Sequence, residues 1–226
     1  MFDRPHWWLD HPVLTVGSVN SLEVEPEDGA CDLVELRLDH LHSVGANIQD
    51  SVRKWQDFPL LFTARCPEEG GVGELSLEQE QSVLETVLAS ATAIDIEVRH
   101  LEASSRLVQR AKEMGVCVVA SSHDFEKTPG SGDYDKIIDQ AVNAGADILK
   151  CAARLHSVSD IETLASVLKN SPLPASAMGM GALGPGSRVL LASLGSVLNY
   201  GYLGYVETAP GQWPARLLKK AISHST

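Results

Sequence analysis

Short apolar runs rich in β-branched residues recur along the chain, and most of them are separated by segments with helical periodicity. A short apolar run bounded by glycine, proline or charged residues is typical of a strand that is buried on both faces. The pattern predicts eight strands, at residues 12–19, 31–39, 59–65, 93–98, 116–125, 146–153, 173–180 and 201–207.

Helices are predicted between most of these strands, and local signals mark several of their ends. The segments "SLEQ" from Ser76 and "SDIE" from Ser159 have the form of capping boxes, and Gly115 and Gly145 follow helical patterns as stops. Between the first two strands, the acidic, proline-containing "NSLEVEPEDGA" leaves room only for a stunted helix or a loop. The predicted helices cover residues 47–56, 77–90, 104–114, 133–144, 160–169, 188–194 and 214–223.

The alternation of strand and helix predicts a single (β/α)8 barrel domain over residues 1–226, with a reduced first helix and a short N-terminus. A doubly wound open sheet is the alternative, because periodicity does not show whether the sheet closes.

Composition narrows the choice of partners. The chain has 18 lysines and arginines against 30 acidic residues, and a net charge of −12 disfavours nucleic acid or an anionic membrane as a partner. The four cysteines form no CxxC pair, "MFDRPHWWLDHP" lacks the apolar core of a secretory signal, and no stretch reaches the length of a membrane span. We therefore expect a soluble, cytoplasmic protein with reduced cysteines.

Charged residues alternate with apolar ones on two of the predicted strands. Glu35, Arg37 and Asp39 share one face of "LVELRLD", as Asp95 and Glu97 do in "AIDIEV". An antiparallel sheet with one wet face would give the same alternation. In a parallel barrel covered by helices, that face is a confined interior, where ionisable groups are costly unless they pair or do chemistry. The pattern therefore favours a site near the C-terminal ends of the strands.

Lys150 and His123 are the residues best suited to covalent and proton-transfer chemistry. Lys150 lies within "GADILKCAAR", and a desolvated amine near other cations can lose its proton and attack a carbonyl to form a Schiff base. A salt bridge to a strand carboxylate such as Glu97 would explain the lysine equally well. His123 lies where the fifth strand gives way to a loop, and there it could shuttle protons, make a structural hydrogen bond, or bind a metal with Asp124. The other histidines show no ligand spacing such as HxxxH, which weakens the metal interpretation.

An anion site is predicted at "GPGSRVL", where a glycine-rich loop meets a helix start that carries Arg188. On this segment alone, an arginine that only caps a neighbouring strand is as good an explanation. In "ETAPGQW", Thr208 and Gln212 could close over a ligand, and Met180 could wall the pocket. No Walker sequence occurs, and no nucleotide cofactor is expected.

Six segments, taken in order, resemble the type I 3-dehydroquinate dehydratases of the shikimate pathway. They are "ELRLD", "ARCPEEGG", "SSHDF" with the following "TP", "GADILKCA", "MGMGALGPGSR" and "APGQ". The resemblance runs from about Val13 to the last helix. It implies a (β/α)8 barrel, usually a homodimer, that converts 3-dehydroquinate to 3-dehydroshikimate through an imine, with no metal or organic cofactor.

The resemblance also implies roles for individual residues. Lys150 would form the imine, His123 would be the general acid and base, and Glu69 would partner the histidine. The substrate would be bound through its ring hydroxyls by Glu35, Arg37 and Arg65, and through its carboxylate by Arg188, Thr208 and Gln212. Thr208 stands where the family typically has serine, and Cys66 and Pro67 depart from the usual loop, which leaves Glu68 as an alternative to Glu69.

Two other functions fit parts of the pattern. A class I aldolase would also use a strand lysine and an anion site, although it should bind phosphate rather than a hydroxylated ring acid. A barrel of the same ancestry could also bind a small acid without catalysis. A purely structural protein is the poorest fit, because the interior would carry many charges without purpose.

Overall fold

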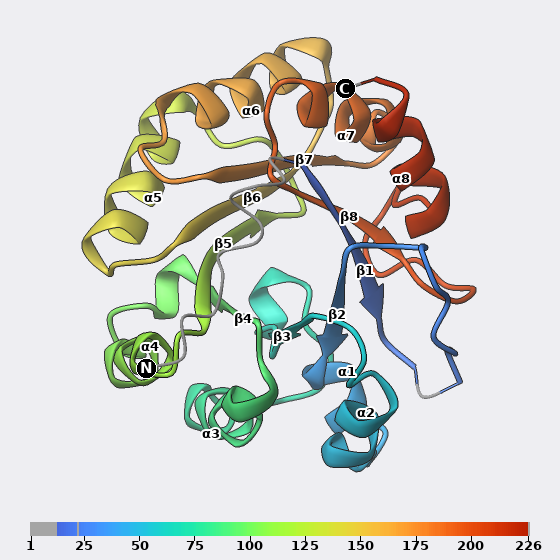
Figure 1. Ribbon diagram of the computed structural model, residues 1–226. Helices are drawn as coiled ribbons and strands as arrows, with labels where there is room; N and C mark the ends of the chain where they lie inside the picture. The colour runs from blue at the N-terminus through green and yellow to red at the C-terminus, as the bar shows by residue number, and fades with distance from the viewer. Residues whose placement is uncertain (1–12, 22, 226) are drawn as a thin grey trace.

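The computed structural model describes residues 13–21 and 23–225. Eight parallel strands form one sheet in the order β7-β6-β5-β4-β3-β2-β1-β8, and the helices form a ring outside it (Figure 1). Consecutive strands pair from β1 to β7, the first strand pairs with the last, and only β7 and β8 lack a strand ladder within the described residues. The predicted (β/α)8 barrel is therefore confirmed, in a nearly closed form, and the doubly wound open sheet is wrong.

Most strands lie where the apolar runs predict them, and the eighth is the exception. The prediction of 201–207 is wrong because the strand has already ended at Tyr202, and Gly204, with a φ of 85°, turns the chain out of the extended conformation. The strands are β1 (Leu14–Val19), β2 (Leu33–Arg37), β3 (Leu60–Thr63), β4 (Ala93–Glu97), β5 (Cys117–Asp124), β6 (Ile148–Arg154), β7 (Ala175–Met180) and β8 (Leu198–Tyr202).

The helices follow the predicted alternation with one difference near the start of the chain. Between β1 and β2, the described residues 20–21 and 23–32 form no helix, as the acidic proline-containing connection predicts. A short helix that the sequence did not predict starts directly after Arg37, so Asp39 lies in a helix and not on the strand. The α-helices are α1 (Leu38–Ser43), α2 (Ile48–Lys54), α3 (Leu77–Val87), α4 (Ser105–Glu113), α5 (Ser131–Asn143), α6 (Val158–Asn170), α7 (Gly184–Ser193) and α8 (Ala215–Ser223).

The helix-end signals are largely confirmed. Ser76 caps α3 in a reciprocal capping box with Gln79, and Gly115 and Gly145, which follow α4 and α5, have φ values of 69° and 73°. The box predicted from Ser159 is wrong by two residues, because Ser157 is the N-cap of α6.

The interior and exterior faces of the barrel have different side chains. One apolar cluster fills the space between the sheet and the helices, and a second, which includes Leu14, Leu33, Ile148 and Leu198, fills the lower part of the barrel. Because this floor is apolar, the charged inward-facing residues are confined to the opposite end, where the strands end.

The seam between β7 and β8 is held by serine side chains. Leu198 N–H donates to Ser176 Oγ (2.8 Å), Ala177 N–H donates to Ser196 Oγ (3.1 Å), and one backbone bond, Val197 N–H to Ala175 O (3.0 Å), crosses the same seam. The two hydroxyls satisfy backbone groups where the strands diverge.

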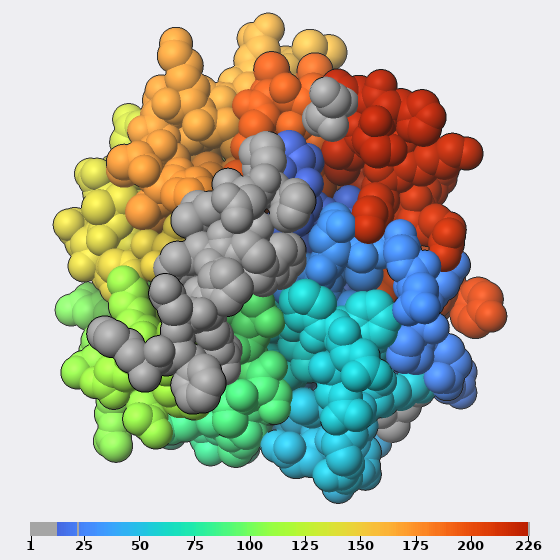
Figure 2. Space-filling view, viewed as in Figure 1, coloured from blue at the N-terminus to red at the C-terminus, as the bar shows by residue number. Residues whose placement is uncertain are grey.

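The space-filling view shows the helical segments packed side by side around the rim (Figure 2). Within the described residues, no helix combines the length and the apolar character needed to cross a bilayer. The prediction of a short N-terminus concerns residues 1–12, which lie outside the described part of the chain.

Candidate active site

A pocket opens at the C-terminal ends of the strands, and all ten residues that the sequence singled out line it. Their sequence positions are far apart, and the barrel topology brings them together because parallel strands end at one face. The ten are Glu35, Arg37, Arg65, Glu69, His123, Lys150, Met180, Arg188, Thr208 and Gln212.

Lys150 lies inside the barrel as the third residue of β6, which continues for four residues beyond it. Its ammonium nitrogen is 2.9 Å from Asp95 Oδ2 and 3.9 Å from Glu35 Oε1, and it lies 4.1 Å from the centre of the Tyr200 ring. The salt bridge to a strand carboxylate that the sequence allowed is therefore present, and its partner is Asp95 on β4 rather than the neighbouring Glu97 that served as the example. The nearest ionic partners of the amine are carboxylates rather than the cations we expected.

His123 faces the same pocket from the neighbouring strand, one step closer to its mouth, since the register pairs Ser121 with Lys150 and His123 with Ala152. Burial, followed by the charges of Arg65 and Lys150, lowers the pKa of His123 well below its ordinary value. The imidazole is therefore neutral at neutral pH, the form that can accept a proton.

Glu69 holds the histidine through two contacts to one oxygen. Its Oε2 accepts from the backbone N–H of His123 (2.8 Å) and lies 2.9 Å from the ring Nδ1, while Oε1 is 3.0 Å from Arg99 Nε. An Nδ1–H that donates to this carboxylate leaves Nε2 as the basic nitrogen. Of the two candidate acids in the loop, Glu69 is buried and Glu68 is exposed, so the choice of Glu69 agrees with the geometry.

Burial has the largest effect on the Glu69 carboxyl. It raises the pKa to about 7, with Glu97 acting in the same direction and Arg65 opposing it. Glu69 thus changes its charge near neutrality, in direct contact with the His123 ring.

The loop that presents Glu69 depends on the double glycine after it. Gly70 ends a single 3-10 turn, Pro67–Glu69, with a φ of 85°, and a Cβ on Gly71 would lie 1.9 Å from the carbonyl oxygen of Arg65. The chain can reverse this close to β3 only without side chains at both positions.

Arg65 lies beyond the end of β3 and is held in a buried ion network. Its NH1 donates to Glu97 Oε1 (2.8 Å) and Ser121 Oγ (2.6 Å), and its NH2 donates to Asp95 Oδ1 (2.8 Å). Burial is the largest single effect and would raise both carboxyl pKa values. Arg65, together with His100 and backbone N–H donors, nevertheless lowers the pKa of Glu97 to about 2, and Arg65 together with Lys150 and Ser121 lowers that of Asp95. Asp95 therefore links the arginine to the lysine as a fixed negative charge.

Glu35 and Arg37 are oriented by their neighbours on β1, β3 and α1. Glu35 accepts from Ser18 Oγ (2.5 Å) and Thr63 Oγ1 (2.7 Å), and Arg37 makes two bonds to Asp39, at 2.9 and 2.6 Å. Asp39 was predicted to lie on the same strand face as Arg37. It lies on α1 instead, and it contacts Arg37 from there.

Arg188 is 1% exposed and lies within α7. The sequence prediction of a flexible loop before it is wrong, since the helix already begins at Gly184 with Pro185 in its first turn, where proline costs no hydrogen bond. NH1 donates to Tyr200 O (2.8 Å), and Nε has no hydrogen-bond partner among the described residues. Burial lowers the pKa of Arg188 to about 10, with Glu207 as the opposing charge.

No carboxylate of the described residues forms an ion pair with Arg188, so a buried guanidinium faces the pocket with its charge uncompensated. A desolvated cation of this kind is suited to an anionic ligand.

Thr208 and Gln212 lie on the loop between β8 and α8. Gln212 Oε1 accepts from both the backbone N–H (2.9 Å) and the hydroxyl (2.6 Å) of Thr208. Since a backbone N–H can only donate, this contact identifies the amide oxygen and leaves the amide NH2 as the donor for a ligand.

Sequence reasoning did not select several residues that complete the pocket. Tyr200 was hidden by the misplaced eighth strand, and Ser18 and Phe125 gave no signal. Asp95 was visible in the charge alternation of its strand, but nothing along the chain connected it to Lys150.

Together, the barrel and the convergence of lysine, histidine and arginine at its C-terminal end define an enzyme of the (β/α)8-barrel class. The family model of the type I 3-dehydroquinases matches residues 13–226. The chain belongs to the type I 3-dehydroquinase family.

Several relatives support this assignment at the level of sequence. The 3-dehydroquinate dehydratase of Methanococcoides burtonii is 33% identical over 201 residues, covering 87% of this chain and 85% of the relative. The catabolic 3-dehydroquinate dehydratase of Acinetobacter baylyi is 33% identical over 213 residues, covering 88% and 78%.

Solved structures agree on the fold. The 3-dehydroquinate dehydratase of Geobacillus kaustophilus superimposes with a TM-score of 0.82 at 24% identity, covering 94% of this chain and 90% of that one. The type I enzyme of Clostridium difficile, with covalently modified comenic acid, gives 0.81 at 23% identity and covers 94% and 91%.

Proposed function

We propose that this enzyme dehydrates 3-dehydroquinate to 3-dehydroshikimate and water through an imine on Lys150. The observation that carries the proposal is the placement of Lys150 and His123 on neighbouring strands, facing one pocket with the uncompensated Arg188, in a chain of this family.

The first step joins the amine to the substrate ketone. The ammonium of Lys150 gives up a proton, its nitrogen forms a bond to the C3 carbon, and the carbonyl oxygen leaves as water once it has gained two protons. The resulting protonated imine withdraws electrons from C2 and makes the C2 proton more acidic. Asp95 stays ionised beside the nitrogen and stabilises the cationic imine.

His123 then moves the proton. The neutral imidazole takes the proton from C2, and the imidazolium so formed protonates the C1 hydroxyl, which leaves as water while the C1–C2 double bond forms. Glu69 orients the ring and stabilises its charged form. Hydrolysis of the imine consumes one water, releases the product and regenerates Lys150, so that one water is released per turnover.

Binding groups surround the reacting carbons. Arg188 and the Gln212 amide are suited to the substrate carboxylate, with Thr208 fixing the amide. Glu35 and Arg37, held rigidly by their neighbours, are suited to ring hydroxyls, and Met180 supplies apolar surface. Both terminal nitrogens of Arg65 are engaged by Asp95, Glu97 and Ser121, which favours an electrostatic role over direct hydroxyl binding.

A direct test follows the conjugated enone of the product by its ultraviolet absorbance. We expect the wild-type protein to convert 3-dehydroquinate, and Lys150→Ala to lose at least about 1,000-fold in kcat because no other amine replaces the covalent step. Lys136→Ala, which removes an exposed lysine on α5, is the control and should keep full activity. A Lys150→Ala protein with near-normal turnover would contradict the proposal.

Borohydride reduction separates this mechanism from non-catalytic binding. In the presence of 3-dehydroquinate it should add a substrate-derived mass to the peptide that contains Lys150. A barrel that only binds small acids would give neither adduct nor enone. The class I aldolase alternative predicts an adduct with a sugar phosphate instead, and the family match weighs against it.

We also propose that the enzyme is a cytoplasmic homodimer, as its resemblance to the family implies. All four cysteines are buried and unpaired, which suits a reducing compartment. Light scattering coupled to size-exclusion chromatography tests the oligomeric state, and a monomer mass would contradict it.

A further inference from the structure

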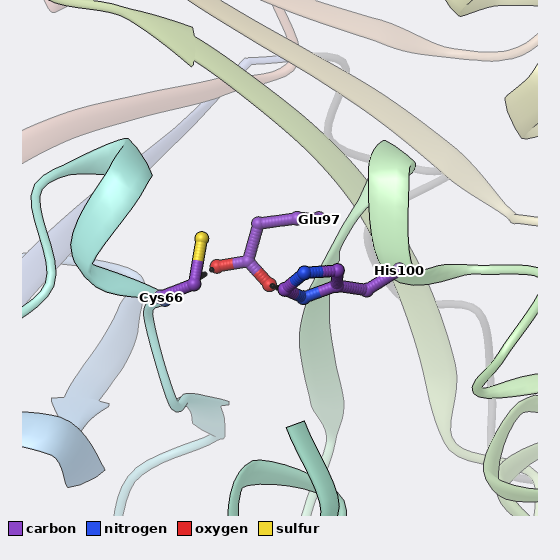
Figure 3. A group of neighbouring side chains, drawn as sticks. All are labelled: Cys66, Glu97 and His100. Carbon is purple, nitrogen blue, oxygen red and sulfur yellow. Dashed lines mark hydrogen bonds and ion pairs between the residues drawn. The ribbon is translucent and has the colours of Figure 1, made fainter. Parts of the chain in front are cut away.

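We propose that Cys66, Glu80, Glu97 and His100 form a binding site for a zinc-like divalent cation that is separate from the substrate pocket. None of the four lines that pocket. They come together where β3 and β4 end beneath α3, and Figure 3 shows the Cys66 sulfur and the His100 ring on either side of the Glu97 carboxylate.

The donor atoms have the chemistry of a zinc site, and two of their separations match its spacing. One ligand atom each from Cys66, Glu97 and His100 lies within 4.8 Å of the others, and His100 Nδ1 is 3.4 Å from Glu80 Oε2 and 3.6 Å from Glu97 Oε2. These separations are long for hydrogen bonds, but tetrahedral ligands at about 2.0–2.3 Å from a zinc ion are themselves about 3.3–3.7 Å apart. Thiolate and imidazole donors favour zinc over magnesium or calcium.

Two further observations point to a ligand between these groups. His100 Nδ1 is buried and has no hydrogen-bond partner among the described residues. A cavity of about 10 Å³ is lined by Glu80, Glu97 and His100 together with residues of α3, β4 and α4, although Cys66 is not among its lining residues. This volume is close to the space one water molecule needs, so a smaller cation fits.

Glu97 is positioned by contacts outside the cluster of donor atoms. Glu97 is fixed through Oε1 by Arg65 and by the Cys66 N–H, which leaves Oε2 directed at His100. Such outer contacts orient metal ligands.

The test uses the full chain without an affinity tag, treated with a chelator and then titrated with Zn²⁺ by calorimetry. We expect one site, and His100→Gln should weaken it at least about 100-fold, which exceeds the usual effect of losing an outer contact. Titration with Co²⁺ should give thiolate charge-transfer absorption that is lost in Cys66→Ser and kept in Cys31→Ser, the control for another buried cysteine.

Three results would overturn the proposal. The first is that the wild-type protein shows no saturable Zn²⁺ binding, and the second is that His100→Gln binds Zn²⁺ with unchanged affinity. The third is that the Co²⁺ spectrum has no thiolate band. Should the variants fail to fold, X-ray absorption of the zinc-loaded wild-type protein decides, because one sulfur among nitrogen and oxygen ligands is expected and a shell without sulfur contradicts the site.

Discussion

The pKa of the His123 imidazole is lowered and the pKa of the Glu69 carboxyl is raised, although the two groups are in contact. Burial destabilises the charged form of each, so the histidine stays neutral to unusually low pH while the carboxyl keeps its proton up to about pH 7. Near neutrality, the neutral imidazole therefore contacts a carboxyl that is partly protonated.

This pairing predicts the pH profile. In the wild-type enzyme, kcat/KM should rise with pH through about 7, as Glu69 ionises and becomes able to stabilise the imidazolium. In Glu69→Gln, the rise of kcat/KM with pH should move below pH 6.5, to the lowered pKa of His123. The value of kcat should fall about 10- to 100-fold with KM little changed, because Glu69 holds the His123 ring.

Steady-state rates from pH 5 to 9 provide the measurement. Glu68→Gln removes the exposed neighbouring carboxylate and should behave as the wild type. An unchanged acid limb in Glu69→Gln would show that the carboxyl does not control the histidine.

Arg188 supports a separate prediction about binding. Lysine at this position keeps a positive charge but loses the planar pair of donors, so Arg188→Lys should raise KM for 3-dehydroquinate about 10- to 100-fold, which corresponds to one charged hydrogen bond. Arg106→Lys on the exposed face of α4 is the matched control. If Arg188→Lys and Arg106→Lys had equal KM values, Arg188 would not be the group that binds the substrate carboxylate.

At the level of single residues, the sequence predicted which side chains meet but not how they pair. Lys150, His123 and Arg188 were identifiable from their motifs. The pairing of Lys150 with Asp95, rather than with Glu97, depends on a register between strands that no local pattern specifies. The Cys66 and His100 cluster was invisible for the same reason, because its members come from α3, from the end of β4 and from the turns that follow β3 and β4.

At the level of elements, the turn after β3 shows how strongly backbone geometry controls the site. Gly71→Ala would force a Cβ against the carbonyl oxygen of Arg65, so the turn must move and carry Glu69 away from His123. We expect kcat to fall about 100-fold, as displacements near 1 Å can cause, while the far-ultraviolet circular dichroism stays that of the wild type.

The control for this change is Gly132→Ala. That glycine lies in the first turn of α5 with nothing within 4 Å of the added carbon, so activity should be unchanged and stability slightly increased. Full activity in Gly71→Ala would mean that the glycine pair does not set the position of Glu69.

Most elements were predictable because a strand buried on both faces and an amphipathic helix leave clear patterns. The errors have local causes. α1 was missed because "LRLD" continues the strand alternation although the chain already turns at Leu38, and β8 was displaced because apolar residues continue past Gly204 into an exposed loop. In both cases a change of backbone direction, not of polarity, ends the strand.

At the scale of the whole molecule, buried carboxyls set opposing pH limits on stability. Glu97 has a pKa lowered to about 2, so the stability it contributes is present above its unfolded value of 4.5 and is lost as the pH falls toward 2. The pKa of Glu69 is raised to about 7, so its protonated carboxyl stabilises the folded state below pH 4.5. This stabilisation is lost as the pH rises from 4.5 to 7. Taken together, these two groups place the maximum of stability near pH 4.5.

Urea unfolding at pH 3.5, 5 and 8 tests this balance. Glu97→Gln should lower the free energy of unfolding at pH 5 by about 3 kcal/mol, since it leaves Arg65 partly uncompensated, and should lessen the decline toward pH 3.5. Glu69→Gln should lessen the decline toward pH 8. A wild-type stability that rises steadily from pH 5 to 8 would contradict the assignment of these groups.

The burial of all four cysteines makes the native enzyme convenient for spectroscopy. Tyr205, on the loop that also carries Thr208 and Gln212, is 98% exposed, so a cysteine introduced there would react with a maleimide dye far ahead of the buried thiols. The fluorescence of that dye would report loop movement as substrate enters, in real time and on an otherwise unmodified protein.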